Sequence, residues 1–215
     1  MAQQTWNNVF ERPDLHWEDP DWHVVGMIPL LHTIDAERVL DLGCGAGRHL
    51  CFLSREGFEV VGQDASDIAL HLAKRALKRH ALQAELVEHD MDEIPFPDGS
   101  FDAVISALAI YHNRLDGLKK SISEVHRALK PGGYFLVWFL SCKEWEREKS
   151  LPGAEEIEPF TLLKGGDVPD AGIPHHFSDE DEVRNVLLKD FQILCLEESM
   201  EPGRPVHWIA LGRRE

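Results

Sequence analysis

The fold is read first from residues 38–47, RVLDLGCGAG. Residues 38–42 predict a short buried strand, which the glycine run at 43–47 ends, and residues 48–56 then predict a helix closed by Gly57. Glycines let a backbone turn sharply and lie against a bound molecule where a Cβ would collide. The first turn of the next helix offers free N–H groups and positive dipole character. The pattern predicts a ligand-binding turn; the alternative is a tight turn whose glycines serve its conformation alone.

The spacing of these glycines argues against a dinucleotide site. The fingerprint G-x-G-x-x-G, counted from Gly43, needs a glycine at position 48, which is Arg48. Counted from Gly45, it needs one at position 50, which is Leu50. The third glycine comes one residue too early to support a pyrophosphate.

Outward from this turn, strand-like and helix-like segments alternate along the chain. One expected helix is capped by Ser66, and another, at 115–129, carries apolar residues at helical spacing and ends at Pro131-Gly132-Gly133. The further expected strands are 58–62, 84–88, 101–107 and 134–140. Alternation of this kind predicts an α/β fold with a mostly parallel sheet and helices on both faces.

The last third of the chain differs in composition. Residues 142–201 carry 16 acids and 6 bases, a net charge of −10. Near their end we expect a helix at 179–188, capped by Ser178, and a strand at 191–197. A final strand at 206–211, joined to it through Pro202-Gly203, predicts an antiparallel hairpin at one edge of the sheet.

Composition excludes several classes of protein. The 215 residues are 43% hydrophobic, so the chain is not disordered, and its net charge of −16 disfavours nucleic acid or an anionic membrane as a partner. The longest apolar run, 134–140, is far shorter than the roughly 20 residues of a membrane helix. The N-terminus lacks a signal pattern, and four cysteines without metal spacing predict free thiols. We therefore expect a cytoplasmic protein, monomeric or homodimeric, without nucleic-acid or membrane partners.

A carboxylate follows the second strand, at Asp64. At this position in an α/β sheet, a carboxylate can accept hydrogen bonds from both hydroxyls of a ribose. The alternative is a capping or surface acid before Ser66.

Four segments together resemble the class I S-adenosylmethionine-dependent methyltransferases, in family order and over about residues 36–140. They are VLDLGCGAG at 39–47, GQDAS at 62–66, HDMDEIPFPDGSFD at 89–102 and RALKPGG at 127–133. They are similar to motif I, the ribose-binding turn, the segment before the fourth strand and the turn before the fifth. The spellings look closest to the branch with quinone- and tellurite-type methyltransferases.

The resemblance implies a Rossmann-like sheet of seven strands, parallel except for one in an edge hairpin, and transfer of a methyl group from S-adenosylmethionine to a small molecule. Asp41 and the glycines would hold the methionine end of the cofactor, Asp64 the ribose, Asp90 the adenine amino group, and the backbone N–H of Met91 the ring. The expected cofactor-binding residues are Asp41, Gly43, Cys44, Gly45, Gly47, Asp64, Ala65, Asp90, Met91 and Ala107. Gln63 departs from the apolar residue usual in the family, and we expect it to loosen that strand end slightly.

This reading divides the chain into an N-terminal cap segment (1–35), a cofactor-binding core (36–140) and an acidic insertion with the C-terminal strand pair (141–215) of one domain. Two other functions stay open. One is an S-adenosylmethionine-binding regulator without catalysis, which would use the same binding residues. The other is a nucleotide-linked oxidoreductase, which the glycine spacing disfavours.

The expected acceptor side follows the fourth strand, at Tyr111 and His112. His112 is the candidate catalytic base or substrate contact, with an ionisation near the ordinary value of about 6.5; a solvated or packed histidine is the alternative. His175 and His176 are adjacent in a segment that we expect to be extended, where two neighbouring side chains do not easily face one ion. No set of acids or cysteines at ligand spacing accompanies them. We therefore expect no metal site.

Two further features allow opposite interpretations. The N-terminal aromatics Trp6, Phe10, Trp17 and Trp22 either cover the cofactor and form an apolar substrate wall, or pack the first helix onto the sheet edge. The acidic segment either favours a cationic or neutral substrate, or is a solvated face.

Overall fold

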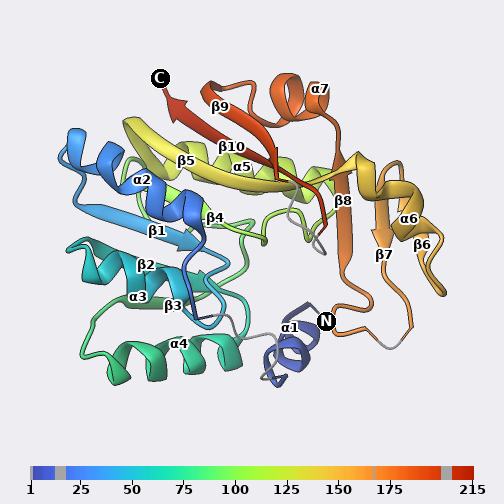
Figure 1. The fold of residues 1–215 in the computed structure, drawn as a ribbon, viewed down its shortest axis with the longest axis horizontal. Helices are drawn as coiled ribbons and strands as arrows, with labels where there is room; N and C mark the ends of the chain where they lie inside the picture. The colour runs from blue at the N-terminus through green and yellow to red at the C-terminus, as the bar shows by residue number, and fades with distance from the viewer. Residues whose placement is uncertain (1, 13–17, 167, 200–204) are drawn as a thin grey trace.

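The computed structural model of the 215-residue chain describes all residues except 1, 13–17, 167 and 200–204. Its sheet contains the seven strands that the sequence led us to expect, in the order β3-β2-β1-β4-β5-β10-β9 (Figure 1). Strands β1 to β5 are parallel, and β10 is antiparallel to both β5 and β9. The bounds are β1 (Arg38–Leu42), β2 (Glu59–Asp64), β3 (Glu85–Glu88), β4 (Phe101–Ser106), β5 (Leu129–Ser141), β9 (Phe191–Ser199) and β10 (His207–Arg214).

Three strands of the acidic segment were not expected. They are β6 (Glu155–Glu158), β7 (Thr161–Leu163) and β8 (Pro174–Ser178). Strand β8 pairs with the end of β5, so the described part of the chain forms a ten-stranded sheet rather than a seven-stranded one. The 3₁₀ turn η2 (Cys142–Glu144) and helix α6 (Trp145–Lys149) precede these strands. Trp145 packs against Phe160 and Phe177, which gives this extension an apolar contact of its own.

Helices cover both faces of the sheet, as expected, and each face has its own core (Figure 1). One face carries α2 (Trp22–Thr33), α3 (Arg48–Arg55) and α4 (Asp67–Arg79). The other carries α5 (Leu115–Ala128) and the segment formed by α7 (Glu180–Glu182) and η3 (Val183–Leu187). No helix among the described residues is long and apolar enough to cross a membrane.

The N-terminal helix α1 (Ala2–Phe10) lies against the start of α4. Asn7 links the two helices, because its Nδ2 donates to Asp67 (2.7 Å) and its Oδ1 accepts from the Ser66 hydroxyl (2.7 Å). Ser66 also caps α4, as expected, by accepting from the N–H of Ala69 (3.1 Å). One serine therefore begins α4 and anchors α1.

Three local expectations need correction. Pro131-Gly132-Gly133 lies inside β5, because Leu129 already pairs with Phe101 before a register irregularity, and regular pairing resumes at Tyr134. The C-terminal helix is capped by Asp179, whose carboxylate accepts from Glu182 N–H (2.8 Å). Ser178 is not the cap, since it belongs to β8, and the helical segment ends at Leu187. The turn Pro202-Gly203 lies outside the described residues.

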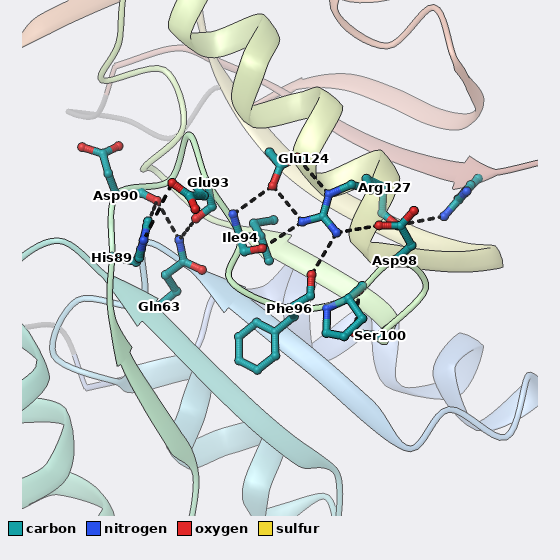
Figure 2. Close-up of polar contacts among 12 residues, drawn as sticks. Gln63, His89, Asp90, Glu93, Ile94, Phe96, Asp98, Ser100, Glu124 and Arg127 are labelled. Carbon is teal, nitrogen blue, oxygen red and sulfur yellow. Dashed lines mark hydrogen bonds and ion pairs between the residues drawn. The ribbon is translucent and has the colours of Figure 1, made fainter.

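Arg127 of α5 holds the loop that precedes β4 (Figure 2). Its guanidinium donates to the carbonyls of Ile94 and Phe96 and to the Asp98 carboxylate, each at 2.8 Å. Glu124, one turn earlier, accepts from Arg127 and from the Ile94 N–H (3.1 Å). The hydrogen bonds and charges of Glu124 and Asp98 raise the pKa of Arg127, so the guanidinium stays charged. This network fixes the loop between β3 and β4.

We expect Arg127→Met to lower the free energy of unfolding by about 2–3 kcal/mol, because it leaves two loop carbonyls and two carboxylates without their donor. Urea denaturation measures the change. Arg184→Met is the matched control, since Arg184 pairs with Glu180 on an exposed helix turn, and it should cost less than about 0.5 kcal/mol. Equal losses in the two variants would contradict a bracing role for Arg127.

Candidate functional site

The glycine turn after β1 is hydrogen-bonded to the end of β2. The N–H groups of Gly43 and Cys44 donate to the Gln63 carbonyl (2.8 and 3.1 Å), and the Gly45 N–H donates to Asp64 Oδ2 (2.9 Å). Gly43 has a φ of +76°, and a Cβ there would lie 2.4 Å from the Cβ of Ala109. Its backbone conformation and its close neighbour both require glycine.

Two adjoining cavities open beside this turn. The smaller, about 80 Å³, lies against Gly43, Asp64, Ala65 and Met91. The larger, about 420 Å³, lies against the glycine turn and the segment after β4. They share Trp6, Phe10, Gly43 and Leu108 in their walls. The turn therefore borders both spaces, which favours the ligand-binding interpretation of its sequence.

Seven of the ten expected cofactor-binding residues line these cavities. They are Gly43, Cys44, Gly45, Asp64, Ala65, Met91 and Ala107. Gly47 lies instead against α4, where a Cβ would be 2.9 Å from that of Ala73. The Asp90 side chain is exposed and points away from Gln63 (Figure 2).

Asp41 lies beneath the glycine turn and is 1% exposed. Its Oδ1 is 3.9 Å from His49 Nδ1, and its Oδ2 is buried without a hydrogen-bond partner among the described residues. A buried carboxylate oxygen left in this state is costly unless a donor or a cation reaches it. Asp41 lines neither cavity, and its Oδ2 keeps unused capacity to accept a hydrogen bond.

The Asp64 carboxylate is buried at the end of β2. Its Oδ1 accepts from the Ser66 N–H and its Oδ2 from the Gly45 N–H, both at 2.9 Å. Burial raises the pKa of Asp64 to about 6, and the negative charge of Asp41 adds to the rise. The two N–H donors act in the opposite direction and lower the pKa. Each oxygen keeps lone-pair capacity for a further donor.

Gln63 tightens its strand end, contrary to our expectation that it would loosen it. The side chain is fully buried, and its Nε2 donates to the carbonyls of Asp90 (2.8 Å) and Glu93 (2.9 Å), as Figure 2 shows. A buried amide can donate two hydrogen bonds from one nitrogen, which no apolar side chain at this position could do. Gln63 thereby fixes the loop that carries Met91 beside the small cavity.

The wall of the larger cavity contains both Tyr111 and His112, the two residues expected on the acceptor side. The Tyr111 hydroxyl is 3.3 Å from His207 Nε2, and burial raises the pKa of this tyrosine. Burial lowers the pKa of His207 to about 4. Burial, and then the charge of His175, lower the pKa of His112 well below its usual range. This direction runs against the expected ionisation of His112 near the ordinary value of about 6.5.

The N-terminal aromatics divide between the two interpretations. Trp6 and Phe10, on α1, line both cavities, and the Trp6 ring meets the His112 ring edge-on at 4.9 Å. Trp22 is 61% exposed and stacks on His23 instead. Trp17 lies outside the described residues.

Several residues of the larger cavity were missed in the sequence analysis. They come from segments far apart along the chain and are Val9, Asp21, Ala46, Arg48, His49, Leu108, Trp138, Pro169, Asp170, Ser199, Pro205 and His207. Ala46 lies within the glycine motif, and Arg48 and His49 follow it directly, so these three were within reach of sequence reasoning. No local pattern marks the others.

Comparison with known proteins agrees with this geometry. Residues 39–133 match a family model described as a methyltransferase domain. Residues 39–133, less than half of the chain, form a methyltransferase domain. The resemblance on which we based the expected fold is thus confirmed, and the matched region runs from β1 to the irregular part of β5.

Relatives and solved structures extend the comparison. An uncharacterized methyltransferase of Synechocystis is 41% identical over 99 residues, 46% of this chain and 45% of that one. A demethylmenaquinone methyltransferase of Thermus thermophilus is 38% identical over 103 residues, 47% of this chain and 46% of that one. The crystal structure of a Pyrococcus horikoshii protein matches with a TM-score of 0.72 and 25% identity, and covers 90% of both chains. The chain spans just under half the length of the two curated relatives.

The methyltransferase domain should lose stability as Asp64 ionises. Its folded pKa of about 6 exceeds the ordinary 3.8, so the folded state holds this proton more tightly than the unfolded state. The resulting stabilisation is complete below pH 4 and is lost as the pH rises through 6. Relative to Asp64→Asn, the wild type should lose about 2.4 kcal/mol of unfolding free energy between pH 4 and pH 7.

Chemical denaturation across this pH range measures the difference. Asp116→Asn is the control, because it removes an exposed carboxylate and leaves Asp64 in place. In Asp116→Asn, the free energy of unfolding should fall with rising pH as it does in the wild type. If the difference in unfolding free energy between the wild type and Asp64→Asn is the same at every pH in the range, Asp64 does not titrate near 6.

Proposed function

We propose that this protein is an enzyme that transfers a methyl group from S-adenosylmethionine to a small-molecule acceptor. The observation that carries the proposal is the position of the glycine turn between two adjoining cavities. The smaller has a buried carboxylate at its edge, and the larger is walled by aromatic and polar side chains. A donor and an acceptor can therefore meet over one turn of backbone.

S-adenosylmethionine is the cofactor, and the residues of the site fit it. Asp64 receives the ribose hydroxyls, while the backbone of Met91 and Ala65 borders the adenine. The unpartnered Asp41 Oδ2 and the Cβ-free surface of Gly45, near Phe10, suit the methionine end, which carries an ammonium group. Bound there, the cofactor supplies a methyl group on a sulfonium, a reactive donor for direct displacement.

The protein's own contribution is alignment and exclusion of water. The acceptor's lone pair forms the new bond to the methyl carbon, and the C–S bond breaks with its electron pair going to sulfur. Trp6 and Phe10 line both cavities, where their rings can exclude water from the donor and the acceptor. Tyr111 and His112 contact the acceptor.

The acceptor is a small molecule with an apolar body. Trp138, Leu108 and Val9 supply the apolar wall of the larger cavity, and Tyr111 and His112 lie among its polar groups. The volume of about 420 Å³ is within the range of small-molecule sites, and part of it belongs to the cofactor. The demethylmenaquinone methyltransferase of Thermus thermophilus, whose name indicates a quinone substrate, is consistent with an acceptor of this kind.

Cofactor binding is the first test. S-adenosylhomocysteine at 100 times its Kd should stabilise the protein by about 2.7 kcal/mol and raise the Tm by about 5–10 °C. NAD and NADP should give no shift. In calorimetry, Asp64→Asn should weaken S-adenosylhomocysteine about 10–1000-fold through lost hydrogen bonds to a charged acceptor, whereas Asp116→Asn should bind as the wild type does. Equal shifts with NAD would overturn the proposal.

Turnover is the second test, and it separates an enzyme from a cofactor-binding regulator. An acceptor panel should contain at least one compound with which the protein converts S-adenosylmethionine to S-adenosylhomocysteine. With that compound, His112→Ala should lower kcat/KM about 10-fold or more, while the Kd of S-adenosylhomocysteine should stay within about threefold of the wild type. The reason is that His112 lines the larger cavity and not the smaller one. Parallel losses of turnover and cofactor affinity would place His112 in the cofactor site instead.

A further inference from the structure

Three potential metal-ligating side chains converge at the acceptor end of the larger cavity. They are His112 after β4, Asp170 in the segment between β7 and β8, and His175 in β8. Their ligand atoms all lie within 4.8 Å of one another. The two imidazole rings meet edge-on, with centroids 4.6 Å apart. The sequence analysis did not anticipate this cluster, because 58 residues separate Asp170 from His112 (170 − 112) and no motif connects them.

The hydrogen bonds of the two histidines direct the same nitrogen of each ring to the cluster. His112 Nδ1 lies 3.0 Å from the Ala109 carbonyl, and His175 Nδ1 lies 2.9 Å from the Ile173 carbonyl. A carbonyl only accepts, so each Nδ1 carries the hydrogen, and Nε2 remains to face the cluster. Histidines that bind metals are oriented in this way, with the second ring nitrogen donating to a backbone carbonyl or a carboxylate.

The contact between His175 and Asp170 needs a cation. His175 Nε2 is 2.9 Å from Asp170 Oδ2, and a neutral Nε2 and a carboxylate oxygen are both acceptors. Either a proton or a metal ion must lie between them. Two donor atoms that are each about 2.1 Å from one metal ion, at right angles, are about 3.0 Å apart. The observed separation therefore also matches the spacing of two ligands at right angles on one metal ion.

The surroundings of Asp170 and His175 distinguish this cluster from an ordinary buried pair. Lys164 Nζ donates to Asp170 Oδ2 at 2.9 Å and holds the carboxylate in place, as partners of ligating carboxylates do. The adjacent His176 points the other way, to Thr161 (2.7 Å) and Glu182 (2.9 Å). Strand β8 thus sends one histidine into the cluster and its neighbour out of it.

We propose that His112, Asp170 and His175 bind one divalent transition-metal ion. Two imidazole nitrogens and one carboxylate oxygen suit zinc, iron(II), cobalt(II) or manganese(II), and three protein ligands leave coordination positions open. His112 and Asp170 line the larger cavity, so the open positions face the space of the acceptor.

The metal site specifies the acceptor class, and in this respect it rests on the proposed function. An ion at this place binds an acceptor through an oxygen, as a hydroxyl or a carboxylate. It would lower the pKa of a coordinated hydroxyl, so that the acceptor binds in its deprotonated form and its proton passes to water on binding. The oxygen then keeps a lone pair for the methyl carbon.

The test uses the untagged protein, freed of metal by a chelator, and titrates it with zinc chloride in calorimetry and with cobalt(II) chloride in visible absorption. The wild type should bind one ion per chain, with cobalt(II) bands of nitrogen and oxygen ligation and without sulfur charge-transfer absorption from its cysteines. Asp170→Asn and His175→Gln should weaken binding about 100-fold or more. His176→Gln, which changes the adjacent buried histidine, should stay within about threefold of the wild type.

Each protein is also titrated with S-adenosylhomocysteine, which reports an intact cofactor site and a folded chain. Asp170, whose side chain is 22% exposed, is the position where a conservative change is least disruptive. Wild-type binding weaker than a Kd of about 1 mM, or unchanged binding in both cluster variants, would overturn the metal site. A fall in the Tm of Asp170→Asn without metal binding by the wild type would identify the cluster as an ion pair alone and also overturn it. If the wild type binds the metal ion but does not bind S-adenosylhomocysteine, only the proposed function is contradicted.

Discussion

The site depends on the hydrogen bonds that join the ends of β1 and β2. The Gln63 carbonyl accepts from Gly43 and Cys44, and the next residue, Asp64, accepts from Gly45. The parallel register places Leu42 beside Gln63, so the turn begins where the two strands stop pairing. The turn cannot move without breaking three hydrogen bonds at the edge of a buried sheet. This junction therefore fixes the position of the wall that the two cavities share.

The fold was predictable wherever a signal is local. The glycine run and the serine cap each specify an element within a few residues, and the alternation of such elements specifies a parallel sheet. Gln63 shows where this reasoning ends. Its side chain was judged by comparison with an apolar residue, but its partners, the carbonyls of Asp90 and Glu93, lie 27 and 30 residues away. Only the folded chain shows that this amide braces the loop.

The acidic segment shows the same limit at the scale of an element. Its composition suggested a charged wall or a solvated face, whereas it forms β6, β7 and β8 and extends the sheet beyond β5. Several of its acids are engaged internally: Glu148 with Arg147 and Lys164, Glu158 with Arg114, and Glu182 with His176. Among the described residues, Asp170 is the acid of this segment that reaches the larger cavity. Charge counted along a sequence therefore says little about the charge that a substrate meets.

Two buried carboxylates close to the glycine turn carry an electrostatic cost in the free protein. Asp41 leaves an oxygen without a partner, and burial together with the charge of Asp41 raises the pKa of Asp64. Neutral ligands would leave that cost in place, because they bring no opposite charge. A ligand with a sulfonium and an ammonium group brings two positive charges toward these carboxylates, where the surroundings screen them weakly. Transfer of the methyl group removes the sulfonium charge, so the same carboxylates hold the product less strongly than the cofactor. Under the proposed function, this arrangement favours entry of the charged donor and release of the product, whose thioether sulfur is neutral.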